Sequence, residues 1–316
     1  MKTISIVVPV LNEERSLSPL YREIDEVLSR AGLQAEIIIV DDGSTDGSWN
    51  EIKQLAQRDP RVHGIRFCRN FGKAAALSAG FACVRGEYVV TLDADLQDSP
   101  VEIPRLLDQL EAGFDLVNGW KRRRADPWHK IIPSRVFNWM IRLSSGLRLH
   151  DHNCGLKAYR VQVVREVRIY GELHRFITLL AHARGFRVTE MEVAHRPRLH
   201  GRSNYGVERF VKGLLDLITV RVLTLFGERP LHFLGTAGLI ASGAGLLGLA
   251  YLAWLWVTGH RPIGTRPVLI YSTASLLLGA QMMAAGIVAE LIVSRLGRDG
   301  NDPGRGYRIA ERVGFS

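Results

Sequence analysis

Residues 87–100 read EYVVTLDADLQDSP, an apolar run that ends in a cluster of acidic side chains. The apolar part, continued to residue 95, predicts a strand, and three carboxylates crowd its end: Asp93, Asp95 and Asp98. Carboxylates repel one another at this spacing, so they need a neutralising partner. Mg²⁺ or Mn²⁺ would serve, because hard cations prefer oxygen ligands and often link carboxylates to substrate phosphates. The pattern is also typical of a solvated acidic turn, because a DxD by itself is common.

Strand and helix signals alternate through the first part of the chain. Apolar, β-branched runs predict strands over 4–10, 36–42, 62–67, 87–95 and 114–119. Helical patterns lie between them, over about 12–31, 72–85 and 100–112. This alternation predicts an α/β fold with a doubly wound, mostly parallel sheet. Ligands of such sheets bind at the carboxyl ends of the strands. Three polar segments fall at those ends, namely 9–13, 40–42 and 93–95.

Two long apolar runs near the end of the chain predict transmembrane helices over about 233–257 and 268–290. Each is long enough to cross a bilayer. A pair of core helices in a soluble protein is the alternative, although soluble helices seldom stay apolar on every face for six turns. The predicted organisation is a domain over 1–205, an interfacial amphipathic helix over 206–230, the membrane segment over 231–294 and a tail over 295–316. The tail is expected to be loop-like, with one short strand candidate at Tyr307–Ile309. The helical pattern over 128–147 fits either a core helix or an interfacial one.

The charge of the chain supports the membrane interpretation. The formal net charge is +9, which nucleic acid binding would also explain, but arginines cluster on both outer flanks of the apolar runs. Such an excess predicts that these flanks lie in the cytoplasm. The N-terminus has no apolar segment of signal-peptide length, so the bulk of the chain is expected on the cytoplasmic side of the inner membrane. The three cysteines are an odd number without a CxxC pair, which disfavours disulfides and structural zinc.

Three motifs, in this order and at these separations, resemble those of the family 2 glycosyltransferases. They are VVPVLNEE (7–14), VDDGSTDG (40–47) and DADLQDSP (93–100). Within the family the chain is most similar to the dolichyl-phosphate mannose synthase and bactoprenol glucosyltransferase group. The resemblance covers roughly residues 3–210 and implies a GT-A fold and inversion at the anomeric carbon.

The resemblance also implies roles for individual residues. The base and ribose of a nucleotide sugar would contact Pro9, Leu11, Glu13, Val40 and Asp42, and the rest of the nucleotide would contact Asp93 and Ala94. Asp95 and Gln97, together with Asp93, match the metal site for Mg²⁺ or Mn²⁺. Lys121 stands where the family usually has an arginine near the diphosphate, and a lysine lacks the bidentate geometry of arginine.

Two later segments complete the expected site. RLHGRSNYG (198–206) resembles RxxGxSK, so Arg198 would hold the phosphates, while Asn204 replaces the family lysine and Arg202 could supply its charge. A basic turn is the alternative interpretation. DHNCGLKAYR (151–160) resembles DxxSGF, in which Asp151 would act as base or position the acceptor. A phosphate monoester is already largely ionised at neutral pH, so Asp151 could instead orient groups, bind metal or cap a turn.

The resulting hypothesis is an inverting, metal-dependent transfer of a hexose from a nucleotide diphosphate sugar, UDP-glucose or GDP-mannose, to a membrane polyprenyl phosphate. Negative charge on the departing diphosphate would be stabilised by the metal, Arg198 and Lys121. Alternatives are a membrane glycosyltransferase with another lipid or glycan acceptor, and an inactive nucleotide-sugar-binding accessory subunit. A processive synthase is disfavoured because no QxxRW segment occurs. The small residues of the spans and the strand-forming tail would permit a homo-oligomer.

Overall fold

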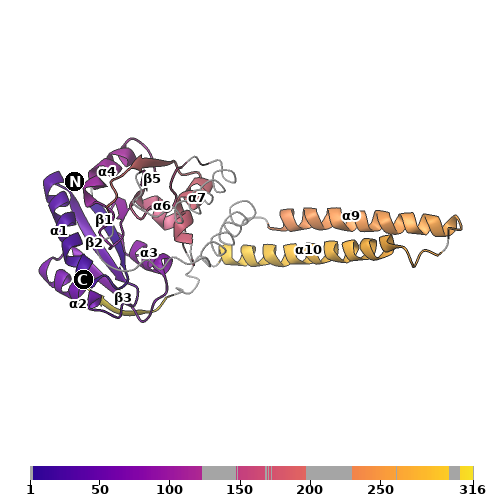
Figure 1. Ribbon diagram of the computed structural model, residues 1–316, viewed down its shortest axis with the longest axis horizontal. Coiled ribbons are helices and arrows are strands. Elements are labelled where there is room, and N and C mark those ends of the chain that lie inside the picture. The colour runs from indigo at the N-terminus through magenta and orange to yellow at the C-terminus, as the bar shows by residue number, and fades with distance from the viewer. Residues whose placement is uncertain are drawn as a thin grey trace. The chain divides into compact units, whose positions relative to one another are not determined.

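The computed structural model describes residues 3–122, 147, 149–167, 169, 171, 173–196, 230–260, 262–298 and 307–315. The chain divides into two compact units, Met1–Val220 together with Arg305–Ser316, and Arg221–Gly304. The first unit is built on a β-sheet and the second contains a pair of long helices (Figure 1). The helical patterns predicted over 128–147 and 206–230 lie almost entirely outside the described residues.

The described strands form one eight-stranded sheet in the order β7-β5-β6-β4-β1-β2-β3-β8. Four neighbouring strands are parallel: β4 (Tyr88–Thr91), β1 (Thr3–Val10), β2 (Gln34–Asp41) and β3 (Val62–Phe67). β6 (Lys157–Arg160) runs antiparallel to both β4 and β5 (Leu116–Trp120), and β7 (Val188–Glu192) pairs in parallel with β5. β8 (Ile309–Val313) pairs antiparallel with β3 at the other edge. The sheet is therefore mixed but mostly parallel at the segments that carry the motifs.

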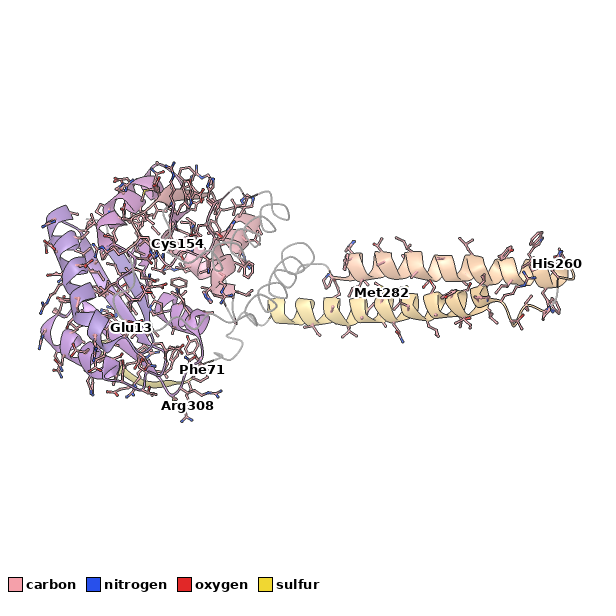
Figure 2. All side chains as sticks on the ribbon, in the orientation of Figure 1. Glu13, Phe71, Cys154, His260, Met282 and Arg308 are labelled. Carbon is pink, nitrogen blue, oxygen red and sulfur yellow. The ribbon has the colours of Figure 1, made fainter. Side chains whose placement is uncertain are left out.

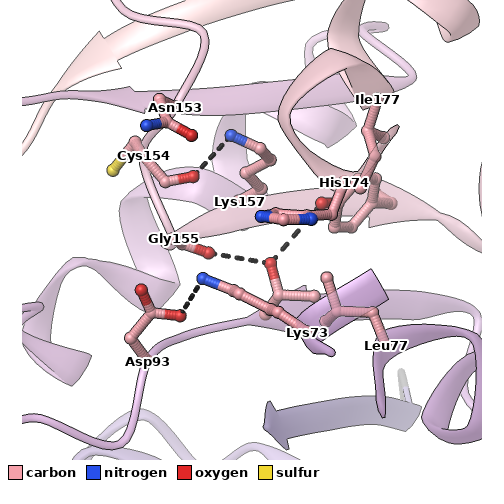
Figure 3. Close-up of a pocket in the computed structure, with 11 residues that line it drawn as sticks. Lys73, Leu77, Asp93, Asn153, Cys154, Gly155, Lys157, His174 and Ile177 are labelled. Carbon is pink, nitrogen blue, oxygen red and sulfur yellow. Dashed lines mark hydrogen bonds and ion pairs between the residues drawn. The ribbon is translucent and has the colours of Figure 1, made fainter. Parts of the chain in front are cut away.

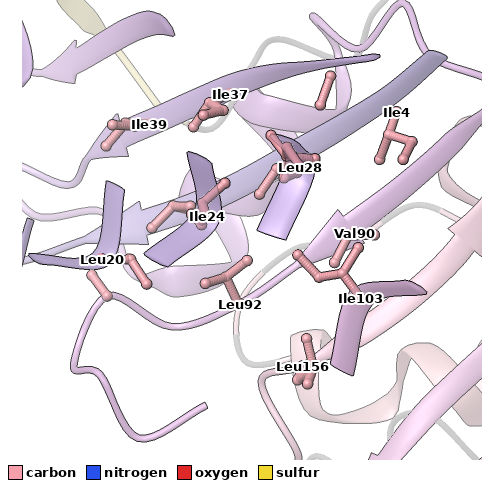
Figure 4. Packing of buried hydrophobic residues seen from close by; sticks show 14 of the residues in the cluster. Ile4, Leu20, Ile24, Leu28, Ile37, Ile39, Val90, Leu92, Ile103 and Leu156 are labelled. Atoms are coloured by element: carbon pink, nitrogen blue, oxygen red, sulfur yellow. The ribbon is translucent and has the colours of Figure 1, made fainter. Parts of the chain in front are cut away.

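Helices cover both faces of the sheet because the strands are apolar on both faces. Ile37 and Ile39 of β2 pack in one core, and Ile38 and Val40 pack in the other. The first core contains side chains of α1 (Glu14–Ala31), α2 (Ser48–Arg58) and α4 (Ile103–Glu111). The 3₁₀ turn η1 (Pro100–Glu102) directly precedes α4. The second core contains α3 (Lys73–Phe81), α6 (Val161–Glu166), η2 (Leu173–Phe176) and α7 (Ile177–Ala183). Figure 4 shows Leu20, Ile24 and Leu28 of α1 among the strand side chains of the first core.

The predicted α/β class is confirmed, with two differences in detail. The strand predicted over 87–95 ends at Thr91, so Asp93 and Asp95 lie in a turn and not on a strand. The tail, predicted to be loop-like with a strand candidate at 307–309, forms β8 from Ile309 to Val313. β8 is fastened by the Trp49 indole, which donates to Glu311 at 2.8 Å, and by Tyr307 stacked on Phe67 with ring centroids 4.9 Å apart.

The second unit contains α9 (Pro230–Val257) and α10 (Pro267–Arg298), joined near His260, which is labelled in Figure 2. By length and composition both are able to cross a membrane, over Pro230–Val257 and Pro267–Ile292. Only 17% and 11% of their most apolar windows is buried, which disfavours the alternative of core helices in a soluble protein. Glycines line the seam between the helices. A Cβ on Gly238 would lie 2.7 Å from the Gly279 carbonyl oxygen, so the two backbones are in contact there.

Candidate active site

The carboxyl ends of β4, β1 and β2 lie side by side and bring the three motifs to one edge of the sheet. The register pairs Val7 with Thr91 and Val10 with Asp41. The loops that follow β1 and β2 are joined by hydrogen bonds. The Asn12 amide donates to Ser44 Oγ at 2.9 Å, and the Thr45 amide donates to Asn12 Oδ1 at 2.9 Å. The predicted juxtaposition of these segments is thus present in the fold.

The five residues expected around the base and ribose differ in accessibility. Leu11 is 41% exposed, whereas Val40 is fully buried in the core and can contribute only backbone. Pro9 is the register partner of Val40 within the strands. Glu13 lies at the start of α1, where its carbonyl accepts the amides of Ser16 and Leu17. Of these residues, Leu11 in the loop after β1 is the one whose side chain is exposed.

Asp42 holds the segment that leads into α3. Its carboxylate accepts the amides of Phe71 at 2.7 Å and Gly72 at 2.9 Å. Burial raises the pKa of Asp42, and these two hydrogen bonds oppose the shift without cancelling it. Gly72 has φ +94°, a conformation that glycine adopts without strain. The result is that Lys73 opens α3 beside the acidic run that follows β4.

Lysines neutralise two of the three carboxylates in DADLQD. Lys73 Nζ lies 2.5 Å from Asp93 Oδ1, and Lys121 Nζ lies 2.7 Å from Asp98 Oδ1. Burial alone would raise the pKa of Asp93, but Lys73 lowers it below its ordinary value. Burial also disfavours the charge on Lys121, yet its neighbours Cys154 and Asp98 raise its pKa above the ordinary value. Burial raises the pKa of the Cys154 thiol to about 12, so the ion pair of Lys121 is with Asp98 and not with Cys154.

The third carboxylate lies at a sharp turn. Leu96 has φ +60°, which costs about 1–3 kcal/mol for a residue other than glycine. Asp95 and Gln97 flank Leu96 in this turn, and Asp95 Oδ1 accepts the Gln97 amide at 3.2 Å. The Gln97 side-chain nitrogen donates to the Arg196 carbonyl at 3.4 Å, which directs its oxygen away from that contact. Strain of this kind is concentrated at functional sites.

The oxygens of this turn suit a divalent cation that also binds a substrate. No group of three His, Cys, Asp and Glu side chains within the described ranges is placed to hold a metal alone. Asp95 and Gln97, with Asp93 nearby, offer carboxylate and amide oxygens. Mg²⁺ is usually held by one or two carboxylates, with substrate phosphates and water as the remaining ligands. The donor set therefore fits a metal that arrives with a phosphorylated substrate.

Asp151 begins a loop that lies against the acidic run. Its carboxylate accepts the Asn153 amide at 3.0 Å, and its side chain is buried. At the other end of the loop, the Gly155 carbonyl accepts the Thr91 hydroxyl at 2.9 Å. The loop that begins with Asp151, the residue predicted to act as base or to position the acceptor, is thus hydrogen-bonded to the end of β4. Arg198, Arg202 and Asn204 lie outside the described residues, so their predicted phosphate contacts remain predictions.

A small cavity lies between this loop and α3. Its volume of about 20 Å³ has room for about one water molecule. Figure 3 shows the residues around it, among them Lys73, Asp93, Asn153, Gly155, Lys157 and His174. Burial lowers the pKa of His174 well below its ordinary value, and Lys73 adds to the shift, so the imidazole is neutral. Lys157 is also buried, and its pKa falls to about 8.

Sequence reasoning missed Lys73 and Lys157. Each carries a signal that could have identified it. A lysine in the first turn of a helix is unfavourable to the helix dipole, so Lys73 at the start of α3 indicates a nearby anion. Lys157 stands between Leu156 and Ala158 in a short apolar strand, where an unpaired charge would be costly.

Known proteins that are similar to this chain indicate its family. Residues 5–168 match the model of Glycosyl transferase family 2. The dodecaprenyl-phosphate galacturonate synthase of Rhizobium johnstonii is 37% identical over 95% of this chain and 90% of its own length. The undecaprenyl-phosphate 4-deoxy-4-formamido-L-arabinose transferase of Aeromonas hydrophila is 32% identical over 92% of this chain and 89% of its own.

Solved structures support the fold. Glucosyl-3-phosphoglycerate synthase from Mycobacterium tuberculosis, crystallised with Mn²⁺, uridine diphosphate and phosphoglyceric acid, aligns with a TM-score of 0.56 at 21% identity. The alignment covers 71% of this chain and 78% of that one. The same enzyme with Mn²⁺ and uridine-diphosphate-glucose gives a TM-score of 0.53 at 22% identity, over 71% of this chain and 79% of that one. The solved structures show the GT-A fold of the sheet domain. The matched family model and the relatives at 37% and 32% identity show that this chain is a member of the family 2 glycosyltransferases.

Proposed function

We propose that the chain transfers a sugar from a nucleotide diphosphate donor to the phosphate of a membrane polyprenyl phosphate. The observation that carries the proposal is the strained turn with Asp95 and Gln97, which follows β4, whose last residue, Thr91, is hydrogen-bonded to Gly155 in the loop of Asp151. The turn with Asp95 and Gln97 suits a metal-bound diphosphate, and the loop of Asp151 suits an acceptor. The relatives named above act on dodecaprenyl and undecaprenyl phosphate, which supports a lipid acceptor. The two long apolar helices would keep such an enzyme beside its lipid substrate.

The chain's own groups bind and orient the reactants. An oxygen of the lipid phosphate attacks the anomeric carbon, the bond from that carbon to the diphosphate oxygen breaks, and the nucleoside diphosphate leaves with the bonding electrons. A divalent ion held by Asp95 and Gln97, either Mg²⁺ or Mn²⁺, would supply positive charge to the leaving group. Arg198 and Lys121 are proposed to add to that charge. The acceptor phosphate is already ionised at neutral pH, so the role proposed for Asp151 is to orient and not to deprotonate.

The donor sugar is proposed to be a hexose. UDP-glucose and GDP-mannose are the first donors to test, because the motifs resemble those of enzymes that use them. The names of the relatives add galacturonate and 4-deoxy-4-formamido-L-arabinose, so the panel of donors should include both. We further propose that α9 and α10 both cross the inner membrane and that the sheet domain lies in the cytoplasm, because Arg295, Arg298 and Arg305 follow the second apolar run.

The test is to incubate membranes that contain the protein with radiolabelled donors and to measure label in the lipid fraction. We expect one donor to label lipid in the presence of Mn²⁺ or Mg²⁺, and Asp95→Ala to reduce labelling about 100-fold. Asp108→Ala, on the exposed side of α4, is the matched control and should keep full activity. Equal labelling by wild type and Asp95→Ala would exclude the metal role. Nucleotide binding without any transfer would instead indicate an accessory subunit.

A further inference from the structure

The loop over residues 150–155 is held by side chains from three neighbouring strands of the sheet. Glu190 on β7 accepts the amide of His150 at 2.7 Å and that of Asp151 at 3.4 Å. Asn118 on β5 donates its side-chain N–H to the Asp151 carbonyl. Lys157 on β6 donates to the carbonyls of His152 and Cys154. A surface loop of six residues would not need three such supports, so its backbone position is strongly specified.

Lys157 lies at the centre of this support. Only 3% of its surface is exposed, and its ammonium donates to three oxygens: Asn118 Oδ1, the His152 carbonyl at 3.1 Å and the Cys154 carbonyl at 2.5 Å. An ammonium has three N–H donors and no acceptor, so each donor has one partner. A neutral amine would keep only two donors and would turn a lone pair toward one of the oxygens. The arrangement therefore fits the charged form of Lys157. Figure 3 shows this side chain directed at the Cys154 carbonyl.

Burying this charge costs stability, and no carboxylate hydrogen-bonds to it among the residues described. The neighbours of Lys157 are neutral oxygens, which compensate an ammonium less well than an anion would. The cost is consistent with a geometric role. Fixing the carbonyl of Cys154 also fixes Gly155, which packs directly against the Asp93 carboxylate. Fixing the carbonyl of His152 fixes the residue that follows Asp151.

We propose that Lys157 is a positioning residue of the transfer reaction: its ammonium sets the backbone of residues 151–155, and so holds Asp151 beside the acceptor and Gly155 beside Asp93, without contacting either substrate. The proposal rests on the proposed function for one point, namely that the loop faces the acceptor. The contacts that define the loop do not depend on it.

The main variants are Lys157→Met, which keeps the length and removes the charge, and Lys157→Arg, whose planar guanidinium cannot match three converging oxygens. Lys53→Met on α2 is the matched control. We expect Lys157→Met and Lys157→Arg to lower the turnover number about 10- to 100-fold, while the donor KM and the affinity for UDP with Mn²⁺ stay within about two-fold of wild type. Wild-type turnover in both variants would overturn the proposal, as would a folded variant that loses turnover and nucleotide binding to the same extent.

The pH profile is a second measurement. Burial lowers the pKa of Lys157 to about 8, so the ammonium is present below that pH and is lost as the pH rises through it. Other groups near the side chain are Cys154 and Asp151 of the loop, Lys73 on α3, Asp93 after β4 and the neutral His174 on η2. We expect wild-type turnover to fall above about pH 8, and Lys157→Met to lack this limb. A limb that persists unchanged in Lys157→Met would contradict the role of the charge.

Two further measurements keep the test decisive. Hydrogen exchange needs no substrate: the amides of 151–155, including that of Asn153, should exchange faster in Lys157→Met than in wild type. Unchanged exchange would overturn the proposal whether or not the acceptor is a lipid. The acceptor itself is tested separately, by lipid labelling with the wild-type protein. If Lys157→Met does not fold, Asn118→Ser removes one of the three oxygens and should show the same split between turnover and nucleotide binding. If both fold, the double variant should lose little more than either single one, because the two side chains act as a unit.

Discussion

Gly155 permits Asp93 to lie where it does because it has no side chain. A Cβ at this position would lie 2.5 Å from Asp93 Oδ2 and 2.8 Å from Oδ1, closer than real Cβ atoms approach other atoms. Lys73 holds the same carboxylate from the other side. A new methyl group would push Asp93 away and disturb that ion pair, so the glycine serves the site and not its own backbone.

We predict that Gly155→Ala lowers transfer activity about 100-fold and lowers the free energy of unfolding by about 1–3 kcal/mol, the range for overpacking in a filled interior. Transfer assays and thermal unfolding measure the two effects. Gly264→Ala is the control, because nothing lies within 4 Å of a Cβ there. Gly155→Ala with full activity would mean that Asp93 has room to move and that its present position is not needed.

At this scale the sequence predicted the acids but not their partners. DADLQDSP marks Asp93, Asp95 and Asp98 by their crowding, and the fold confirms that they lie together at the end of β4. Their neutralisation was expected from a metal. The structure adds two lysines to that expectation, since Asp93 pairs with Lys73 and Asp98 pairs with Lys121. Those lysines are distant in sequence, and their approach depends on sheet order and on the Asp42 contacts that orient the start of α3, which no local pattern encodes.

At the scale of the elements, the close packing of α9 against α10 depends on glycine. A Cβ on Gly279 would lie 2.5 Å from the Gly238 carbonyl oxygen and 2.7 Å from the Ser242 amide nitrogen. Both are backbone atoms, which cannot rotate away as a side chain would. Contacts between small residues supply the association of such helices where the surroundings are apolar.

Gly279→Ala should therefore separate the two helices and lower the melting temperature of the detergent-solubilised protein, whereas Gly243→Ala should not. Gly243 lies on α9, with nothing within 4 Å of a Cβ, so alanine there should be neutral or slightly stabilising. The comparison isolates the seam from the general effect of helix propensity. Equal melting temperatures for the two variants would show that the seam contributes no stability.

Element prediction succeeded where periodic runs were long. β1, β2, β3 and α1 follow the predicted ranges closely, and the two apolar helices are present. β6 and β7 were not predicted, because they have only four and five residues and both contain charged side chains, buried at Lys157 of β6 and partly exposed on β7. Their pairing with β5 comes from tertiary contacts, so a short polar run such as Val188–Glu192 gives no local signal of a strand.

On the scale of the whole molecule, the sheet is completed by a strand that follows the long helices in sequence. β8 covers the edge of β3, where a row of N–H and C=O groups would otherwise be open to another chain. The cover is held by main-chain pairing, by the Trp49–Glu311 hydrogen bond and by Phe315 stacked on His63 with centroids 4.9 Å apart. Edges of this kind lead to aggregation when exposed.

Removal of residues 307–316 should lower the thermal stability of the sheet domain and cause aggregation after extraction in detergent. Size-exclusion chromatography and light scattering measure the aggregation, and removal of Ser316 alone is the control. Glu311→Gln, which keeps the strand but weakens one fastening, should give a smaller effect. A monodisperse protein of wild-type stability after removal of 307–316 would show that β3 tolerates an open edge.

The position of β8 in the chain also orders the events of synthesis. The ribosome completes β1 to β7 first, then the two apolar helices, and only afterwards the strand that seals β3. Domains begin to fold as they emerge, so the nascent sheet waits with one side uncovered until α10 has been made and has left the translation machinery. The sheet is thus finished only after both apolar helices have been synthesised, so a chain that stops anywhere within α9 or α10 leaves the edge of β3 uncovered.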